Sequence, residues 1–295
     1  DLALSYLGVG GGLQHLAKNK KSSFGISYNY TDLRLAFKLI KQRPDYFNIP
    51  ILHNGDMNFR IKTSKTGMIK YYGTFSTTNV GFRYADIDSA SMKDAFSLKN
   101  VNLYHNLSWK EKIGTGLKLF TGVSYSTNKD DINNEFQNAS NQKQIITTPT
   151  LFAYKNFVVV NRGEYVNAKV IIEKRLKALS AIRFGGEYNH SNEKSTFTDY
   201  NNASTNGQIK ENIISGFAEG DIYLTNDIAA KIGGRTEHSD QLNKWNVAPR
   251  LSLAYQLHHN NQLSFAYGIF YQDPERKYLP SPNALFFSKA THYIL

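Results

Sequence analysis

Hydrophobic and polar residues alternate with a period of two along most of the chain. In the stretch WNVAPRLSLAYQL, residues 245–257, the odd positions hold Trp, Val, Pro, Leu and Tyr, and the even positions hold Asn, Ala, Arg, Ser and Gln. After HHNN the alternation resumes in QLSFAYGIFY, residues 262–271. Because successive side chains of a strand point to opposite faces, the pattern predicts a long β-hairpin with two unlike faces.

The same alternation, with almost no helical periodicity, predicts about 12 or 13 strands in the whole chain. The candidate strands cover residues 2–17, 22–39, 56–63, 68–84, 97–110, 115–126, 157–176, 180–190, 209–224, 228–237, 245–257 and 262–271, and a further strand begins near Ala290. The predicted fold class is therefore all-β.

The connections between these strands alternate in length. Short turns are expected at NKKS, SKTG, KIGTG, KAL, TND and HHNN, and longer loops at residues 41–55, 85–95, 127–156, 191–208, 238–244 and 272–288. If successive strands are antiparallel, the short turns lie at one end and the long loops at the other. Outer-membrane barrels have this polarity, whereas the crossovers of a soluble β-sandwich mix the two ends. The pattern favours an antiparallel transmembrane β-barrel.

The chemistry of the two faces agrees with a barrel. The polar face is dominated by Gly, Ala, Ser, Asn and scattered Arg, whereas a water-exposed sheet would carry many Lys and Glu. Arg250 facing lipid at mid-depth would cost on the order of 2–4 kcal/mol, so Arg250 is expected to point inward and Leu251 and Leu253 outward, against acyl chains. Aromatic residues expected at the membrane interfaces are Tyr72, Trp109, Trp245, Tyr255 and Tyr271.

Composition excludes several classes of protein. The 295 residues include no Cys, which removes disulfides, thiol chemistry and Cys-ligated metals. No apolar run approaches the roughly 20 residues of a membrane-spanning helix. The mean hydropathy of −0.45 is typical of a soluble protein, but a membrane barrel escapes this rule because only every second residue meets lipid.

The net charge of +11 would suit a nucleic-acid binder. The basic residues, however, lie mostly in predicted turns and loops and form no single stripe, for example Lys18, Lys20, Lys21, Lys110, Lys112, Lys174 and Lys177. We therefore expect no nucleic-acid partner.

Several segments occur in an order that resembles the barrel of TonB-dependent outer-membrane receptors. They are ISGFAEGDIYLTNDIAAKIGGRTEHS, then WNVAPRLSLAYQL, NQLSFAYGIFYQDPE and KATHYIL. The residues that match the family pattern are Phe217, Glu219, Gly233, Arg235, Glu237 and the run from Pro249 to Tyr255. The N-terminal stretch DLALSYLGVGGGLQHL is similar to the first barrel segment after such a receptor's plug. The resemblance implies location in the outer membrane and contact with its lipid bilayer.

Members of that family have a plug domain, a TonB box before it and about 22 strands. Neither the plug nor the TonB box is visible in this sequence, which starts at Asp1 and stops at Leu295 inside an expected strand. We therefore expect residues 1–295 to form one partial barrel domain, the first half of the barrel, without the plug and the C-terminal strands.

Topology makes one local prediction. If NKKS is a periplasmic turn, the chain from Leu2 must go up and come back before Lys18. A reversal inside LGVGGGL would allow this, with Gly8, Gly10, Gly11 and Gly12 in the turn. A single strand over residues 2–17 is the alternative.

Three functions remain open. The resemblance implies an energised importer that captures a scarce ligand, such as a chelated metal, a vitamin or a glycan, and moves it with its own plug and the TonB complex. A passive porin-like channel of about 12–14 strands is the second hypothesis. A surface adhesin is the third. The sequence does not identify the ligand, because loops rich in Asn, Ser, Tyr and Phe suit a sugar and a flat chelate equally well.

Charged residues on the predicted inward face are the candidate site. They are Arg183, Glu187, Lys231, Arg235, Glu237 and Arg250. Buried in a barrel interior, such groups need partners or water. They are candidates for contact with the plug, and ion pairing between adjacent strands explains them equally well.

Other motifs do not point to catalysis or to a cofactor. The glycines of GVGGG lack the Lys and Ser/Thr of a phosphate-binding loop, and His258 and His259 lack a third ligand within sequence reach. Asp130, Asp131 and Glu135 do not have the spacing of a calcium loop. No Gly-x-Ser-x-Gly motif is present. We therefore predict a protein that is not an enzyme and has no metal or cofactor site.

Overall fold

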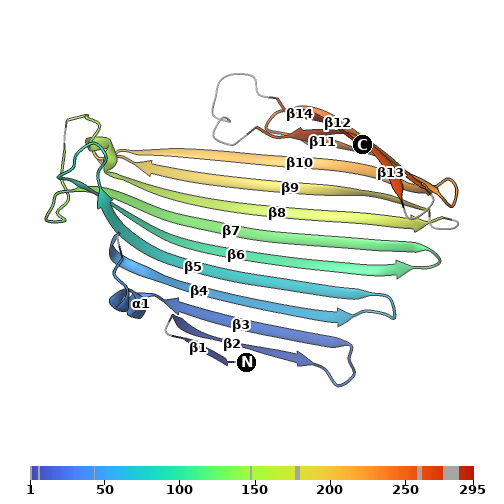
Figure 1. Ribbon diagram of the computed structural model, residues 1–295, viewed down its shortest axis with the longest axis horizontal. Coiled ribbons are helices and arrows are strands. Elements are labelled where there is room, and N and C mark those ends of the chain that lie inside the picture. Colours follow the sequence, from blue (N-terminus) through green and yellow to red (C-terminus); the bar gives the residue numbers. More distant parts are fainter. Residues whose placement is uncertain are drawn as a thin grey trace.

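The chain folds into one antiparallel sheet of 14 strands, in the order in which the strands follow one another along the sequence (Figure 1). The computed structural model describes residues 2–5, 7–42, 44–146, 148–176, 180–257, 261–274 and 286–295. The strands are β1 Leu2–Ser5, β2 Gly8–Leu16, β3 Ser22–Asp32, β4 Asp45–Lys62, β5 Met68–Ala85, β6 Lys93–Ile113, β7 Leu117–Gln137, β8 Phe157–Arg175, β9 Ala181–Thr198, β10 Ser204–Tyr223, β11 Ile228–Ser239, β12 Lys244–Gln256, β13 Gln262–Gln272 and β14 Ser288–Ile294.

Among the residues that the structure describes, two short helices interrupt the meander of strands. Helix α1 covers Arg34–Leu39 between β3 and β4, and the 3-10 helix η1 covers Ala153–Lys155 before β8. Within the described residues, no helix has the length and apolar character needed to cross a bilayer.

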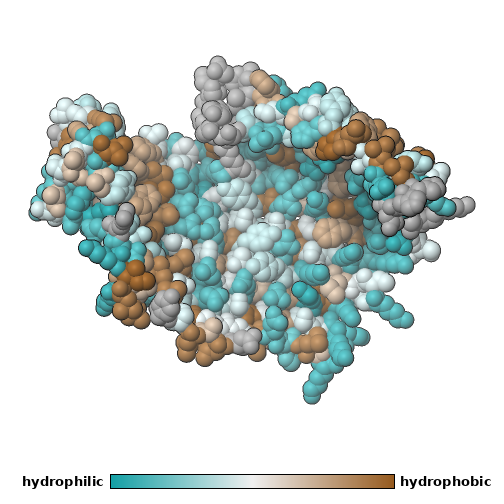
Figure 2. Space-filling view, viewed as in Figure 1, coloured by the Kyte–Doolittle hydropathy of each residue, from teal (hydrophilic) through white to brown (hydrophobic). Residues whose placement is uncertain are grey.

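The register of the sheet separates its residues into two faces. Ser124, Asn167 and Asn189 lie directly opposite one another on β7, β8 and β9 and therefore share one face, which we call the polar face. Their neighbours Val123 and Ala168 share the other, apolar face. Figure 2 looks onto a face that is hydrophilic along its hollowed centre and has hydrophobic residues along its margins. Alternation has thus produced a curved wall with one polar and one apolar side.

The apolar face remains uncovered. Side chains such as Val123, Ile214 and Val247 are 52%, 57% and 63% exposed, and the buried hydrophobic residues of the described part are mostly alanines. A soluble domain buries such side chains between layers, whereas a lipid-facing barrel strand leaves them in contact with acyl chains. The wall therefore has no core of its own on this side.

Several of the predicted strand boundaries are wrong, beginning with those of β3 and β4. Residues 34–39, expected to continue a strand, form helix α1, where the Asp32 side chain accepts the Arg34 backbone N–H and the Phe37 ring packs 4.9 Å from that of Tyr46. Residues 45–55, expected in a loop, belong to β4, whose pairing with β5 is irregular between Tyr46 and Ile51. Pro50 lies in this irregular part, where a strand tolerates the loss of a backbone donor.

The sorting of connections by length holds only in part. Long connections at residues 33–44, 86–92 and 138–156 share one end of the sheet, which we call the long-loop end. Strand β13 ends and β14 begins at this same end. Residues 127–137 and 191–208, expected in long loops, are mostly strand, and the connections at 199–203 and 240–243 are short. Backbone pairing continues beyond the apolar region, where both faces are polar and alternation no longer marks a strand. The expected turns KAL and HHNN include residues 177–179 and 258–260, which lie outside the described residues.

The chain reverses near its N-terminus, as one of the two readings predicted. Strand β1 pairs antiparallel with β2, with Ser5 opposite Gly8. The turn precedes the glycine cluster, so the assignment of Gly8, Gly10, Gly11 and Gly12 to the turn is wrong. These glycines lie in β2, where a Cβ on Gly8 would come 2.0 Å from the Tyr30 carbonyl oxygen. Close approach of β3 explains the glycine at this position.

Four of the five predicted interfacial aromatics lie on the apolar face. Trp109, Trp245 and Tyr255 are at least 36% exposed there, and Tyr271 shares the face of Tyr267. Tyr72 was placed wrongly, because it lies opposite Asn58 on the polar face. Its hydroxyl donates to the Asp56 carboxylate at 2.7 Å. Its neighbour Tyr71 lies on the apolar face instead, opposite Leu107.

Candidate functional site

A chain of ion pairs crosses four neighbouring strands on the polar face, β8 to β11. Arg183 on β9 places Nε 2.9 Å from Glu173 Oε2 on β8 and Nη1 2.7 Å from Asp221 Oδ2 on β10. The same Nη1 lies 3.3 Å from Glu219 Oε1, and Lys231 Nζ on β11 approaches that oxygen to 2.9 Å. Each charge thus has a partner of opposite sign on an adjacent strand.

A second group of ion pairs lies nearer the long-loop end. Arg235 contacts Glu187 at 3.1 Å and Glu237 at 2.7 Å. Glu187 also lies 3.6 Å from Lys169 Nζ and accepts a hydrogen bond from the Asn167 amide at 2.7 Å. The side chains of Glu187 and Arg235 are only 15% and 25% exposed, so water reaches this pair less than the first group.

Arg250 has a different environment. The register places it opposite Gly233 and Gly268, on the same face as Arg183 and Glu219. Its guanidinium carbon lies 4.9 Å from the centre of the Phe270 ring. Within the described part of the chain, the structure assigns Arg250 no carboxylate partner.

The six predicted site residues therefore share one face of β9 to β12, and five of them are in ion pairs. Sequence reasoning left out of the site the charges that complete the pairs, which are Lys118, Lys169, Glu173, Glu219 and Asp221. These charged residues alternate in phase with the other polar residues of β7, β8 and β10. That alternation was the sequence signal that could have placed them on the polar face.

A ladder of amides covers the polar face of β6 and β7 toward the long-loop end. Asn128 Nδ2 donates to Asn102 Oδ1 at 2.6 Å, and the Asn102 amide in turn contacts Asn100. Asn100 Nδ2 donates to the Asp130 carboxylate. The ladder borders a cavity of about 570 Å³ that β8, β9 and β10 also line, with Tyr165 and Glu193 among its residues. Such a surface offers many hydrogen-bond donors and acceptors to a polar molecule.

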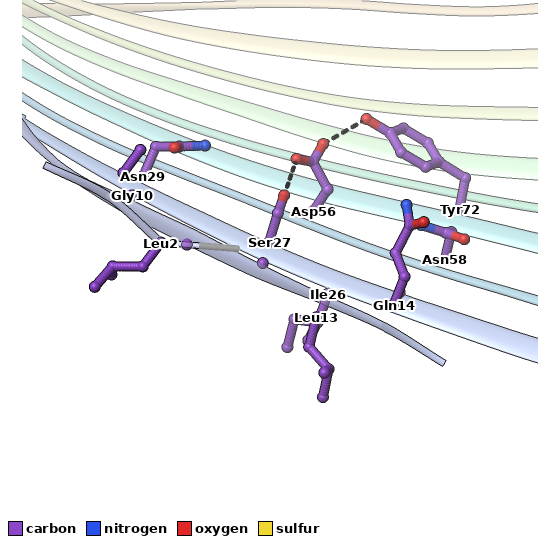
Figure 3. A pocket seen from close by; sticks show the side chains of 14 residues that line it. Leu2, Gly10, Leu13, Gln14, Ile26, Ser27, Asn29, Asp56, Asn58 and Tyr72 are labelled. Carbon is purple, nitrogen blue, oxygen red and sulfur yellow. Dashed lines mark hydrogen bonds between the residues drawn. The ribbon is translucent and has the colours of Figure 1, made fainter. Parts of the chain in front are cut away.

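A smaller polar cluster lies near the N-terminal edge of the wall. Asp56 on β4 accepts hydrogen bonds from Ser27 on β3 and Tyr72 on β5, each at 2.7 Å (Figure 3). In the same view Leu13 and Ile26 point away to the other side of the sheet. The hollow that these residues line measures about 650 Å³.

Charged residues also tie two of the long connections together. Lys155 Nζ contacts the buried Asp86 and lies 2.8 Å from Asp88, which joins residues 138–156 to residues 86–92. Burial opposes the charge on both partners, but their mutual contact outweighs it, lowering the pKa of Asp86 and raising that of Lys155. The bases of these connections are therefore held in one arrangement.

The described residues contain no group of three or more His, Asp or Glu side chains placed to hold a metal ion. His258 and His259 lie outside the described residues. Asp130 and Asp131 lie on opposite faces of β7, because consecutive strand residues do, and Asp131 pairs with Lys129. The chemistry that the polar face supports is recognition by hydrogen bonds and charge.

A curved antiparallel wall with a lipid-type apolar face and a charge-paired polar face is the construction of a transmembrane β-barrel. Residues 14–292 match the family model described as "TonB dependent receptor-like, beta-barrel". The chain belongs to this family, whose members are outer-membrane transporters and not enzymes. A search of curated proteins found no match.

Solved structures share the fold at low sequence identity. The pyoverdine-bound FpvA of P. aeruginosa matches with a TM-score of 0.68 and 10% identity, over 97% of this chain and 43% of FpvA. The outer membrane transporter YddB of Escherichia coli matches with 0.60 and 11%, over 90% and 38%. The RagAB peptide transporter matches with 0.64 and 8%, over 90% and 37%. The chain thus spans about two fifths of the length of these relatives.

Proposed function

We propose that this chain forms part of the barrel wall of a receptor for TonB-driven uptake of a scarce extracellular ligand. One face of the sheet is apolar and uncovered, which suits contact with lipid, and on the other, polar face the charges neutralise one another. This combination is the observation that carries the proposal. In the sheet order, β1 and β14 occupy the two ends, which supports a wall continued by further strands. On this view, residues 1–295 are the first half of the barrel.

The receptor's own plug domain would fill the space in front of the polar face. Arg183, Glu187, Lys231, Arg235 and Glu237 already neutralise one another within the wall. Arg250, whose charge meets only a ring in the described residues, is the best candidate for a salt bridge to the plug. The TonB complex would act on the plug and not on the wall.

The ligand would meet the wall at the long-loop end, where the amide ladder and the cavity beside it lie. The ligand classes to test are iron chelates, peptides, glycans and vitamins. Among the relatives, FpvA binds an iron chelate and RagAB is a peptide transporter. The passive porin-like channel is the alternative that the experiment must separate.

The test uses the full receptor that contains this chain. Cells that carry it are given labelled ferric chelates, peptides and oligosaccharides, with and without a protonophore. Energised transport predicts accumulation of one of these ligands that the protonophore abolishes. Liposomes that contain the purified receptor should not swell in an isotonic disaccharide solution. Swelling, together with accumulation that is insensitive to the protonophore, would instead identify a passive channel.

The role of Arg250 is tested in the same assay. Arg250→Gln should lower energised uptake several-fold while the receptor remains folded, because the charge offered to the plug is lost. Lys231→Gln is the matched control, since its charge is satisfied by Glu219 within the wall. Equal uptake by the Arg250→Gln variant and the unchanged receptor would rule out a plug contact at this position.

A further inference from the structure

Five basic residues that are far apart in the sequence come together on the apolar face, toward the long-loop end. They are Lys99, Lys129, Arg162, Lys194 and Lys210, which we call the basic surface. The register places Lys129, Arg162 and Lys194 directly opposite one another across β7, β8 and β9. Lys99 lies opposite Asp131 on β6, and Lys210 lies opposite Asn192 on β10.

The basic surface follows the main apolar stretch of the strands, toward the long-loop end. On β8 the residues of this face run from Ile172 through Val170 and Val166 to Glu164 and Arg162, and Val160 and Val158 follow nearer the long-loop end. On β7 this part of the face runs from Leu117 through Val123 to Tyr125, about the length that a tilted strand needs to cross the hydrocarbon region. The polar side chains that follow on each strand therefore lie at the level of lipid headgroups.

A tyrosine and a histidine side chain mark the same boundary on the neighbouring strand β9. Tyr188 on β9 is 38% exposed on the apolar face and donates its hydroxyl to Asn212 Oδ1 on β10 at 2.7 Å. His190 contacts the same oxygen. Amphipathic rings prefer the membrane interface, and Lys194 and Lys210 follow directly beyond them.

Positive charge exceeds negative charge on this surface. Against its five cations, the same face carries the carboxylates of Asp131 and Glu164 among these rows. Lys129 pairs with Asp131 at 2.7 Å, whereas Lys99, Arg162, Lys194 and Lys210 are exposed. Cations directly opposite one another on adjacent strands repel, so a bound anion would relieve the repulsion.

We propose that the basic surface binds phosphate groups of lipid headgroups in the outer leaflet of the membrane. Arginine and lysine are the side chains that recognise phosphate, and the position at the edge of the apolar belt presents them to headgroups and not to the barrel interior. The proposal concerns the outside of the wall and depends on placement in the membrane, not on which ligand is transported.

The experiment measures lipid binding to the full receptor in detergent by native mass spectrometry. Phosphatidylglycerol, which is anionic, is titrated against zwitterionic phosphatidylcholine. The triple variant Arg162→Gln, Lys194→Gln, Lys210→Gln should bind phosphatidylglycerol at least about tenfold more weakly, because each cation contributes to headgroup attraction. Salt should weaken binding of the unchanged receptor, since these charges are exposed.

A matched triple variant controls for net charge. Lys18→Gln, Lys20→Gln, Lys21→Gln removes three exposed cations from the turn between β2 and β3, at the other end of the sheet. This variant should keep the affinity of the unchanged receptor. Equal loss in both triple variants, or no loss in the first, would overturn the proposal. Displacement of the lipid by millimolar inorganic phosphate would also overturn it, by showing a site for a free anion. Thermal unfolding of each variant checks that the barrel is intact.

Discussion

At the scale of single residues, glycine positions are decided by how closely backbones approach. A Cβ on Gly185 would lie 2.3 Å from the carbonyl oxygen of Val170 and 2.9 Å from the Phe217 ring, whereas one on Gly186 would meet nothing closer than 3.5 Å. We expect Gly185→Ala to destabilise the receptor by about 1–3 kcal/mol, because the backbone oxygen must move. The adjacent control Gly186→Ala should be nearly neutral. Urea unfolding in detergent measures both, and equal stabilities would contradict this account.

Asp273 makes stability depend on pH. It lies in the loop after β13, where burial and the nearby Glu211 and Glu237 raise its pKa to about 6 from an ordinary 3.8. As pH rises from about 4 to 6, Asp273 loses its proton in the unfolded state but keeps it in the folded state. Ionisation therefore favours the unfolded state, and the free energy of unfolding falls over this pH range. Asp273→Asn should reduce this fall, by about 1–2 kcal/mol after allowance for solvent.

Unfolding midpoints of the full receptor at pH 4 and pH 7 provide the measurement. Asp227→Asn, which removes an exposed carboxylate in a short turn, should leave the pH difference unchanged. If the Asp273→Asn receptor loses as much stability between pH 4 and pH 7 as the unchanged receptor, other groups cause the pH dependence.

At the scale of elements, ion pairs connect neighbouring strands across the polar face. Removing Arg235 takes away the basic partner of Glu237 and leaves Glu187 with only the longer contact to Lys169, so Arg235→Gln should cost about 1–3 kcal/mol of unfolding free energy. The double variant Glu187→Gln, Arg235→Gln should be more stable than the sum of the single effects predicts, with a coupling of about 1 kcal/mol. A double-mutant cycle in urea measures the coupling, and strict additivity would mean that the pair contributes nothing.

At the scale of the whole molecule, the question is whether the two end strands meet. Figure 1 shows β1 and β14 at opposite margins of the sheet. Cysteines at Leu4 and His292 should therefore fail to cross-link in the membrane-inserted receptor. Cysteines at Leu4 and Val9, which lie opposite each other on β1 and β2, should cross-link and serve as the control. An efficient cross-link between positions 4 and 292 would support a small closed channel.

Much of the wall could be predicted from the sequence because lipid and a polar interior act on alternate residues. The alternation predicted that Arg250 and Arg183 point to the same side of the sheet, and the register places both on the polar face. The prediction failed in segments that do not lie between lipid and a polar interior. Residues 191–208 extend beyond the apolar region, so their pairing leaves no period of two, and helix α1 occupies a connection and not a membrane-spanning strand.

The sequence by itself determined the class of the fold and the face of most side chains, because a strand has a period of two and lipid tolerates few charges. Only the tertiary structure decided which charges meet. The register of the strands brings Arg183 next to Glu173 and Asp221. It also places Lys129, Arg162 and Lys194, which are far apart in the sequence, on one surface. Partners on adjacent strands are separated by whole hairpins, and hairpin lengths, not local pattern, set their alignment.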